Sequence, residues 1–289
     1  MIIIEILKAI VFGIVEGLTE WLPVSSTGHM IILNQLMPLV VGDNAEEFYS
    51  MFQVVIQLGA ILAVVVIFWD RIWPFSRENN DYPLAEEGFG AMVRMDVINL
   101  WLHILVSCVP AAIVGVLFDD QLEALFYNYQ TVAIMLITFG IAFIIIETFH
   151  KGVRPKVKGV ANIDYKVAFL IGMFQLIAAI FPGTSRSGAT ILGALLLGVS
   201  RTTAATYTFY LAIPVMFGAS LLKLIKFGFA FSAVQILVLL IGMAVAFVVS
   251  MAVIRFLLGY VRKHDFKAFG VYRILLGILV LILGLVGII

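Results

Sequence analysis

Long apolar runs separated by short polar segments dominate the chain. A helix needs roughly 20 apolar residues to cross the hydrocarbon core of a bilayer. Runs of about that length predict transmembrane helices at Phe48–Trp69, Val97–Phe118, Gln130–Phe149, Thr203–Leu222, Ala233–Leu258 and Ala268–Ile289. The pattern therefore predicts an all-α, polytopic membrane protein with six full transmembrane helices, and residues 1–289 form a single integral membrane domain.

Two further apolar regions are interrupted at their centres by proline, glycine and hydroxyl residues. The arms Ile2–Leu18 and Met30–Val41 flank the polar stretch EGLTEWLPVSSTGH, and the arms Tyr165–Ile180 and Ala189–Val199 flank FPGTSRSGAT. Each arm is shorter than a full crossing. Irregular backbone inside a membrane is tolerated only where protein or a water-filled cavity covers it. We therefore expect two re-entrant helical hairpins.

Composition supports the membrane assignment. The chain is 63% hydrophobic and 12% charged, with a mean hydropathy of +1.12, whereas soluble domains are about half apolar and a quarter charged. The formal net charge is zero, so nothing suggests nucleic acid as a partner. The N-terminal run lacks a basic leader and a cleavage site, so we expect it to belong to the mature fold. The lone Cys108 excludes an intramolecular disulfide.

The placement of lysine and arginine predicts the orientation. The segments Asp70–Asp96, Lys151–Lys166 and Arg255–Lys267 carry three, five and four basic residues, while the alternate segments carry two at most. The positive-inside rule places these three segments in the cytoplasm. Both termini then lie outside, the first hairpin enters from the outer side and the second enters from the cytoplasm.

A weak internal duplication supports this arrangement. An offset of 159 positions pairs Gly13 with Gly172, Glu16 with Gln175, Pro23 with Pro182, Ser26 with Ser185, Gly59 with Gly218 and Ala60 with Ala219. Residues 1–149 would form the first repeat and 150–289 the second, each a hairpin plus three spans. Because each repeat crosses the membrane three times, an odd number, the second copy starts on the opposite side and is upside down relative to the first. We therefore expect an inverted-topology repeat whose two hairpin tips meet near the midplane.

The first polar stretch opens with two carboxylates, Glu16 and Glu20, which share one helix face. Adjacent carboxylates in a low-dielectric site repel each other unless a divalent cation lies between them or one holds a proton. The alternative is a polar stripe at a helix contact. Ionisable groups inside a membrane are costly and usually functional, however, so we favour a metal or acid–base role.

Hydroxyls and a histidine follow the proline of this stretch, at Ser25, Ser26, Thr27 and His29. Hydroxyls beside a turn are often only helix caps, and a single histidine in a loop is more often structural. Together with two carboxylates, however, they supply the parts of an activated nucleophile with acid–base support.

The second polar stretch supplies anion-binding groups. It combines the Arg186 guanidinium with four hydroxyls (Thr184, Ser185, Ser187 and Thr190) and two glycines (Gly183 and Gly188). Glycine lets backbone approach a ligand closely, the amides at the start of a helix favour an anion, and a guanidinium fits phosphate oxygens. A buried salt bridge from Arg186 to Glu16 or Glu20 is the structural alternative, and the two roles are compatible. The combined inventory suits phosphoryl transfer on a phosphate-bearing lipid.

These two motifs closely resemble those of the bacterial undecaprenyl-diphosphate phosphatases, the bacitracin-resistance family: Glu16-x-x-x-Glu20 leads into PVSSTGH, and PGTSRSGAT follows later. The resemblance covers essentially the whole chain. It implies hydrolysis of undecaprenyl diphosphate to undecaprenyl phosphate and phosphate, which recycles the lipid carrier for peptidoglycan and other envelope polymers. It also implies a divalent cation, Mg²⁺ or Ca²⁺, and a multi-pass protein of the bacterial inner membrane whose site opens to the periplasmic face.

The resemblance also assigns roles to residues. Glu16 and Glu20 would serve the metal and acid–base chemistry, and Ser26 or His29 would be the nucleophile. The expected diphosphate-binding residues are Ser25, Thr27, Gly183, Ser185, Arg186, Ser187 and Thr190.

Several alternatives stay open. Another class of lipid phosphatase needs a histidine and an aspartate behind a Ser-Arg pair, but Leu192 and Leu196 hold those places. Broken helices that meet at the midplane would also suit a transporter or a lipid flippase, alone or combined with hydrolysis. A membrane scaffold would leave both motifs unexplained. The sequence does not fix the metal, the lipid chain length, the nucleophile (water included) or the oligomeric state, a homo-oligomer included.

Overall fold

The computed structural model describes residues 2–76 and 80–289, and within these residues it contains helices and three isolated β-bridges but no strand. Six segments of the described residues are long and apolar enough to cross a membrane. They are α3 (Ala45–Val55) with α4 (Gln57–Ile67), α6 (Met95–Phe126), α7 (Tyr129–Phe149), α10 (Arg201–Phe227), α11 (Ala233–Val261) and α12 (Lys267–Leu285). The prediction of an all-α protein with six candidate spans is confirmed.

Four shorter helices pair as two helical hairpins, α1 with α2 and α8 with α9. They are α1 (Ile2–Thr19), α2 (Ser26–Leu36), α8 (Tyr165–Ile180) and α9 (Arg186–Leu196). The second arms begin earlier than the apolar pattern predicts, so Ser26 and Arg186 are the first residues of α2 and α9. Both polar motifs therefore contribute the first turn of a helix. Three short helices lie in connections: α5 (Trp69–Ile72) and the 3₁₀ turns Gly88–Met92 and Val160–Asn162.

Several of the predicted spans differ in detail from the observed helices, and α10 runs to Phe227, five residues beyond the predicted Leu222. The first is broken at Ile56, where α3 ends and α4 begins. The helix α6 continues through Pro110 to Phe126, eight residues beyond the predicted Phe118. The last helix ends at Leu285, and Gly287 then turns with a φ of 73° instead of continuing to the C-terminus.

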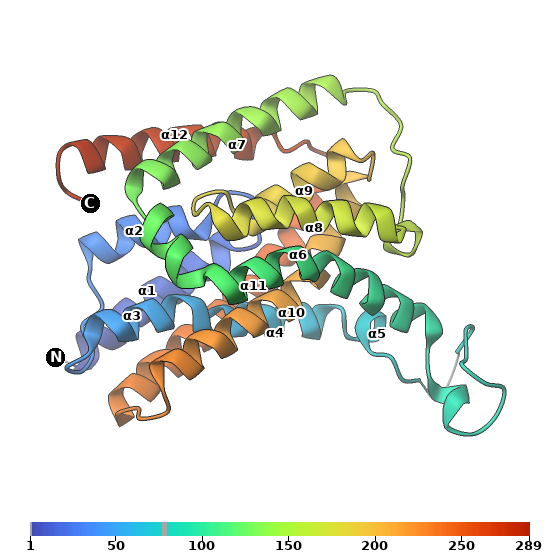
Figure 1. Cartoon of the computed structure of the whole chain (residues 1–289), viewed down its shortest axis with the longest axis horizontal. Coiled ribbons are helices and arrows are strands. Elements are labelled where there is room, and N and C mark those ends of the chain that lie inside the picture. Colours follow the sequence, from blue (N-terminus) through green and yellow to red (C-terminus); the bar gives the residue numbers. More distant parts are fainter. Residues whose placement is uncertain (1, 77–79) are drawn as a thin grey trace.

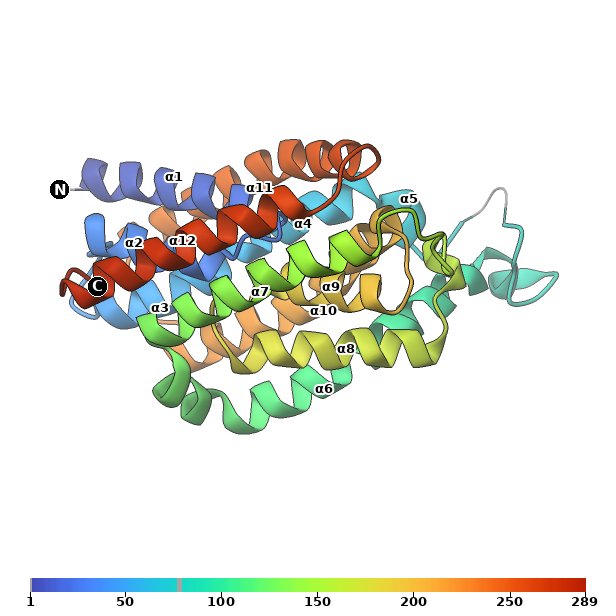
Figure 2. The same cartoon turned by 90° about the horizontal axis from the view of Figure 1, so that it is seen from above.

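The long helices lie roughly along one axis, with both chain termini at the same end of the molecule (Figure 1). Successive long helices run in opposite directions between the two ends of the molecule (Figure 1). The three basic connections follow α4, α7 and α11 and lie towards the opposite end (Figures 1 and 2). The main helix pairs are α7 with α12, α1 with α11, and α6 with α8.

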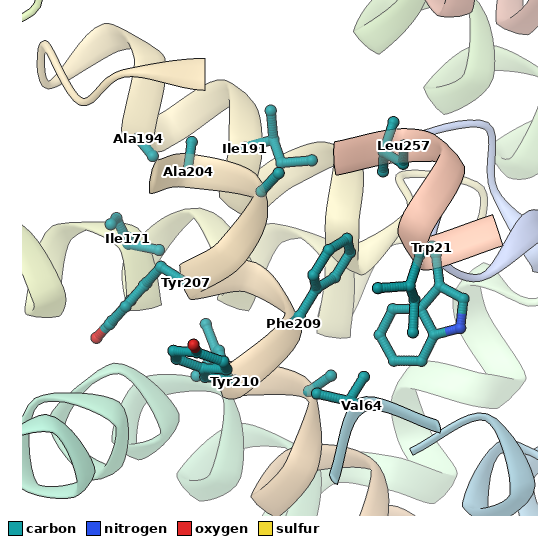
Figure 3. Close-up of a cluster of buried hydrophobic side chains, with 14 of the residues drawn as sticks. Trp21, Val64, Ile171, Ile191, Ala194, Ala204, Tyr207, Phe209, Tyr210 and Leu257 are labelled. Carbon is teal, nitrogen blue, oxygen red and sulfur yellow. The ribbon is translucent and has the colours of Figure 1, made fainter. Parts of the chain in front are cut away.

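A buried hydrophobic cluster with several aromatic rings includes Trp21 of the first polar motif (Figure 3). Trp21, in the first motif, has no exposed surface and packs edge-on against Phe209 of α10, with ring centroids 5.4 Å apart. Phe209 in turn packs against Phe68, and Phe68 against Tyr210. Because rigid aromatic rings fill this space, the backbone that carries the adjacent Glu20 has little freedom to move.

Candidate active site

The two hairpin tips meet at the carboxylate of Glu20. Its Oε1 accepts a hydrogen bond from Arg186 Nη2 at 3.0 Å, and its Oε2 accepts one from Ser26 Oγ at 2.8 Å. Its backbone oxygen accepts a third from Ser187 Oγ at 3.0 Å. The sequence prediction that the two motifs meet is confirmed, and the salt bridge from Arg186 to Glu20 is present.

Arg186 is held on three sides. Besides Glu20, its Nη1 donates to the carbonyl oxygen of Thr208 at 3.0 Å, and its guanidinium lies 5.9 Å from the centre of the Trp21 ring. Its Nε is buried and has no hydrogen-bond partner among the described residues. A donor that lacks a protein acceptor in such a site is available to an oxygen of a bound ligand.

Two adjoining cavities lie on one side of this cluster, and Ser26 lines one of them. The inner one, of ≈110 Å³, is lined by polar side chains that include Glu16, Ser26 and Gln57. The outer one, of ≈210 Å³, extends past Pro182 to Lys223. Both are lined by Thr27, Gln53, Val54 and Tyr127. A ligand in the outer cavity would therefore lie directly beside the inner one.

Glu16 provides a buried carboxylate in the lining of the inner cavity. It is 1% exposed and lies beside Glu20 and the Gln57 side chain. Its Oε1 has no hydrogen-bond partner among the described residues. Within those residues no group of three or more histidine, cysteine, aspartate or glutamate side chains could hold a metal ion. Two carboxylates nevertheless form a pair of hard-oxygen donors, which suits Mg²⁺ or Ca²⁺ when phosphate or water completes the coordination.

The first turns of α2 and α9 have matching backbone geometry. Ser25 and Ser185 each precede their helix with a positive φ, 74° and 67°, which is rare outside glycine. The backbone equivalent of Ser185 is therefore Ser25, one position earlier than the Ser26 that the 159-residue offset pairs with it. The loop after Pro182 is one residue longer than the loop after Pro23. Such strained positions cluster at functional sites.

His29 points away from Glu20. Its Nδ1 lies 2.7 Å from the carbonyl oxygen of Ser25, and its Nε2 lies 2.7 Å from the hydroxyl of Tyr272 on α12. The His29 and Tyr272 rings are stacked, with an interplanar angle of 8°. Of the two nucleophile candidates, Ser26 therefore faces the carboxylate pair, while both nitrogens of His29 already have partners.

The remaining motif residues mostly hold the loops in place. Ser185 Oγ accepts from the Gly188 amide at 3.1 Å and lies 3.2 Å from Ser187 Oγ. Thr190 Oγ1 donates to the carbonyl oxygen of Arg186 at 2.9 Å. Gly183, expected to approach a ligand, instead approaches the backbone of α7: a Cβ there would lie 2.6 Å from the carbonyl oxygen of Val132.

Ser25 is fully buried and its Oγ has no partner among the described residues. Thr27 lines both cavities. Ser26, Thr27 and Ser187 therefore lie at the junction of the hairpins, whereas Thr190 and Gly183 face the protein.

Arg273 of α12 is a site residue that the sequence analysis missed. It has no exposed surface, yet no carboxylate pairs with it among the described residues. Its Nη1 donates to the carbonyl oxygen of Pro23 at 3.2 Å, and its Nη2 donates to those of Gly183 and Thr184 at 3.0 and 2.8 Å. One guanidinium thus binds the loops of both hairpins. The sequence did contain a signal for this residue, because an arginine within a predicted transmembrane span is costly and usually functional.

Gln53 and Gln57 were also missed, because the apolar pattern of the first span hid them. The two amides lie one turn apart on either side of the helix break and line the inner cavity. Tyr127 donates to Gln53 Oε1 at 3.2 Å and so connects the end of α6 to this wall.

The fold and the site together define a multi-pass membrane protein with a buried cluster of carboxylate, hydroxyl and guanidinium groups between two helical hairpins. The profile of a family described as bacitracin resistance protein BacA matches residues 9–279. The chain therefore belongs to that family.

Curated relatives carry an enzyme name. An undecaprenyl-diphosphatase of Desulfitobacterium hafniense is 58% identical over 282 residues, which cover 98% of this chain and 97% of that protein. One of Enterococcus faecalis is 54% identical, with 97% of each chain covered. One of Streptococcus mutans is 52% identical, with 99% of this chain and 98% of that protein covered. The similarity extends over nearly the full length of each chain.

Proposed function

We propose that this protein is a membrane phosphatase that hydrolyses undecaprenyl diphosphate to undecaprenyl phosphate and inorganic phosphate, and so recycles the lipid carrier for envelope polymers. The names of the relatives indicate the activity and the substrate. The observation that carries the proposal is the Glu20 carboxylate, which accepts from Ser26 on one oxygen and from Arg186 on the other. A base (Glu20), a hydroxyl nucleophile (Ser26) and a cation that suits phosphate (Arg186) therefore lie in direct contact.

The hydrogen bond between Ser26 and Glu20 sets the direction of proton transfer. Ser26 Oγ attacks the terminal phosphorus while its proton passes to Glu20 Oε2. The bond from this phosphorus to the bridging oxygen breaks, and undecaprenyl phosphate leaves. Water then cleaves the phosphoserine, which releases phosphate and regenerates the serine. Glu20 passes the serine proton to the departing undecaprenyl phosphate and is ionised again. It can then take a proton from the attacking water and return it to Ser26 Oγ, because Arg186 holds it in place in both steps.

Charge that develops on the transferred phosphoryl group needs donors fixed in advance. Arg186 provides its unpartnered Nε, and the first turns of α2 and α9 provide backbone amides. Arg273 contributes by fixing the loops that precede both helices. These donors lie among buried side chains, where electrostatic interactions are stronger than in water.

We propose that Glu16 and Glu20 hold a divalent cation together with phosphate oxygens of the substrate. Such an ion neutralises phosphate charge during transfer. The support is the free Oε1 of Glu16 and the oxygen-rich wall around it. A chelator should abolish phosphate release, and added Mg²⁺ or Ca²⁺ should restore it. Glu20→Gln should stay folded and lose most turnover, while Glu5→Gln, in a partly buried pair with Lys8 outside both motifs, should not.

We also propose that the two halves are inverted repeats with re-entrant hairpins. Matching helix contacts support this proposal. The first hairpin helix of each half packs on a long helix of the other half: α1 on α11, and α8 on α6. Gly13 and Gly172 are the points of close approach, where a Cβ would lie 2.6 Å and 2.4 Å from a carbonyl oxygen of the partner helix. Gly140 and Gly270 approach each other reciprocally between α7 and α12, at 2.7 Å in both directions.

Under this topology the site opens to the outer face. The outer cavity reaches Lys223 and Glu123 at the ends of α10 and α6, which lie towards the end that carries both termini. The ends of α6 and α8 also line it, through Leu122 and Ile180. We propose that the diphosphate enters between these helices while its lipid tail stays in the membrane.

The decisive experiment supplies the purified protein with a polyprenyl diphosphate and a divalent ion, and measures released phosphate. Ser26→Ala should abolish release, whereas Ser50→Ala on α3, outside both motifs, should not. A transporter or flippase with the same site would move the lipid without releasing phosphate. Lipid movement in the absence of phosphate release would therefore overturn the proposed hydrolysis.

A further inference from the structure

A second, larger cavity lies at the opposite end of the helices from the chain termini. Its volume is ≈750 Å³, and it is lined by the ends of α7, α9 and α11 and the start of α10. It shares no lining residue with the two cavities of the candidate active site. The phosphatase chemistry proposed above makes no use of it.

The lining of this cavity is strongly cationic. It contains Arg154, Lys156, Arg201 and Arg262, with His150 beside them. Its one carboxylate, Glu147, is already engaged: Arg201 Nε donates to both of its oxygens at 2.9 and 3.1 Å, and the Phe266 amide donates to Oε1 at 3.1 Å.

Within the described residues, three of the four lining cations have no carboxylate partner. No ion pair among the described residues involves Arg154, Lys156 or Arg262. The cavity therefore carries a net positive charge that an anion would neutralise.

The start of α10 adds backbone donors to the same wall. Ser200 caps this 27-residue helix by accepting from the Thr203 amide at 3.4 Å. The amides of Arg201 and Thr202 have no acceptor within the helix, and both residues line the cavity. A helix start beside several uncompensated cations favours a phosphate group.

One side of the cavity is apolar and exposed. Val153 and Leu196 line it and are 60% and 48% exposed. Phe149, at the end of α7, is 77% exposed. In a protein with six candidate membrane spans, such side chains at a helix end suit acyl chains rather than water. A phosphate on a lipid satisfies both the charged and the apolar parts of the lining.

We propose that this cavity binds the phosphate of an anionic phospholipid from the leaflet at this end of the molecule, which the basic connections predict to be the cytoplasmic leaflet. The uncompensated cations and the first amides of α10 hold the phosphate, while the acyl chains lie along Val153 and Leu196. Basic pockets between helices on that face are a recognised way to bind such head groups.

The test measures phosphatidylglycerol bound to the full-length protein in phosphatidylcholine nanodiscs, counted by native mass spectrometry as the anionic fraction rises. The variant R154Q/K156Q/R262Q removes the three uncompensated cations. The matched control K151Q/K158Q/K166Q removes the same charge from the same end but outside the cavity. We expect the first to weaken phosphatidylglycerol binding at least about tenfold and the second less than about twofold. Melting temperatures should confirm that both variants are folded.

Each other outcome contradicts the proposal. Equal losses in the two triple variants would mean that binding reflects only the general charge of this face. No loss in either would mean that the lipid binds elsewhere. A third arm adds inorganic phosphate to the protein in phosphatidylcholine alone. If free phosphate raises the melting temperature of the wild type but not of R154Q/K156Q/R262Q, while phosphatidylglycerol is not retained, the ligand is a soluble phosphate and the lipid assignment is wrong.

Discussion

Replacing Arg186 with lysine tests the proposed chemistry most directly. The guanidinium donates to Glu20 at 3.0 Å and to the carbonyl oxygen of Thr208 at 3.0 Å, lies over Trp21, and leaves Nε for a ligand. A lysine ammonium is a single point donor and cannot serve all of these positions. Loss of one fixed donor to a developing oxyanion typically costs a factor of about 10² to 10³. We therefore expect Arg186→Lys to lose at least about a hundredfold in turnover, roughly 2.7 kcal/mol of barrier.

The assay is phosphate release at saturating polyprenyl diphosphate, together with substrate affinity and thermal melting. Binding should weaken less than turnover, because the lipid tail still partitions into the membrane. Arg94→Lys, at an exposed pair with Asp96, is the matched control and should keep its activity. If Arg186 served only as a structural salt bridge, Arg186→Lys would be nearly silent in activity and Arg186→Ala would lower the melting temperature. An active lysine variant would refute the proposed role.

Three further predictions concern the nucleophile, the topology and the buried arginine. If Ser26 attacks, Ser26→Ala abolishes turnover and rapid quenching traps no phosphohistidine; a phosphohistidine at His29 would reverse the assignment, and a reaction with neither adduct would indicate direct attack by water. A cysteine introduced near Lys156 should be labelled only from the cytoplasm and one near Asp120 only from outside; labelling from the same side would exclude the inverted repeat. Arg273→Met should lower both the melting temperature and turnover, because each buried carbonyl left without a donor costs roughly 1–3 kcal/mol; unchanged melting would contradict its role in binding the two loops.

Much of the helical framework follows from local sequence. The predicted arm Tyr165–Ile180 matches α8 at both ends, and the predicted span Gln130–Phe149 matches α7 to within one residue. The length of an apolar run against the thickness of a bilayer is a local property, so it can be read without knowledge of neighbours. The two polar motifs were found for a similar reason, since reactive groups inside apolar sequence are costly.

The ends of the helices were harder to predict than their central parts, because tertiary contacts and turns decide where a helix begins or ends. The apolar pattern continues through Ile56, yet the helix breaks there, and α6 continues beyond Phe118. The first arm residues of α2 and α9 are polar, so hydropathy alone assigned them to loops. Ser185 binds the Gly188 amide and so starts α9 three residues earlier than predicted.

The sequence by itself determined the class of protein, the candidate spans and the list of reactive residues. The tertiary structure decided which of these residues face one another. Glu20 and Arg186 are 166 positions apart, and Arg273 reaches a carbonyl oxygen 250 positions away. No local pattern encodes such pairs, because they depend on how the helices pack. Packing also separated Ser26 from His29: these neighbours on one helical turn point in different directions, one to Glu20 and the other to Tyr272.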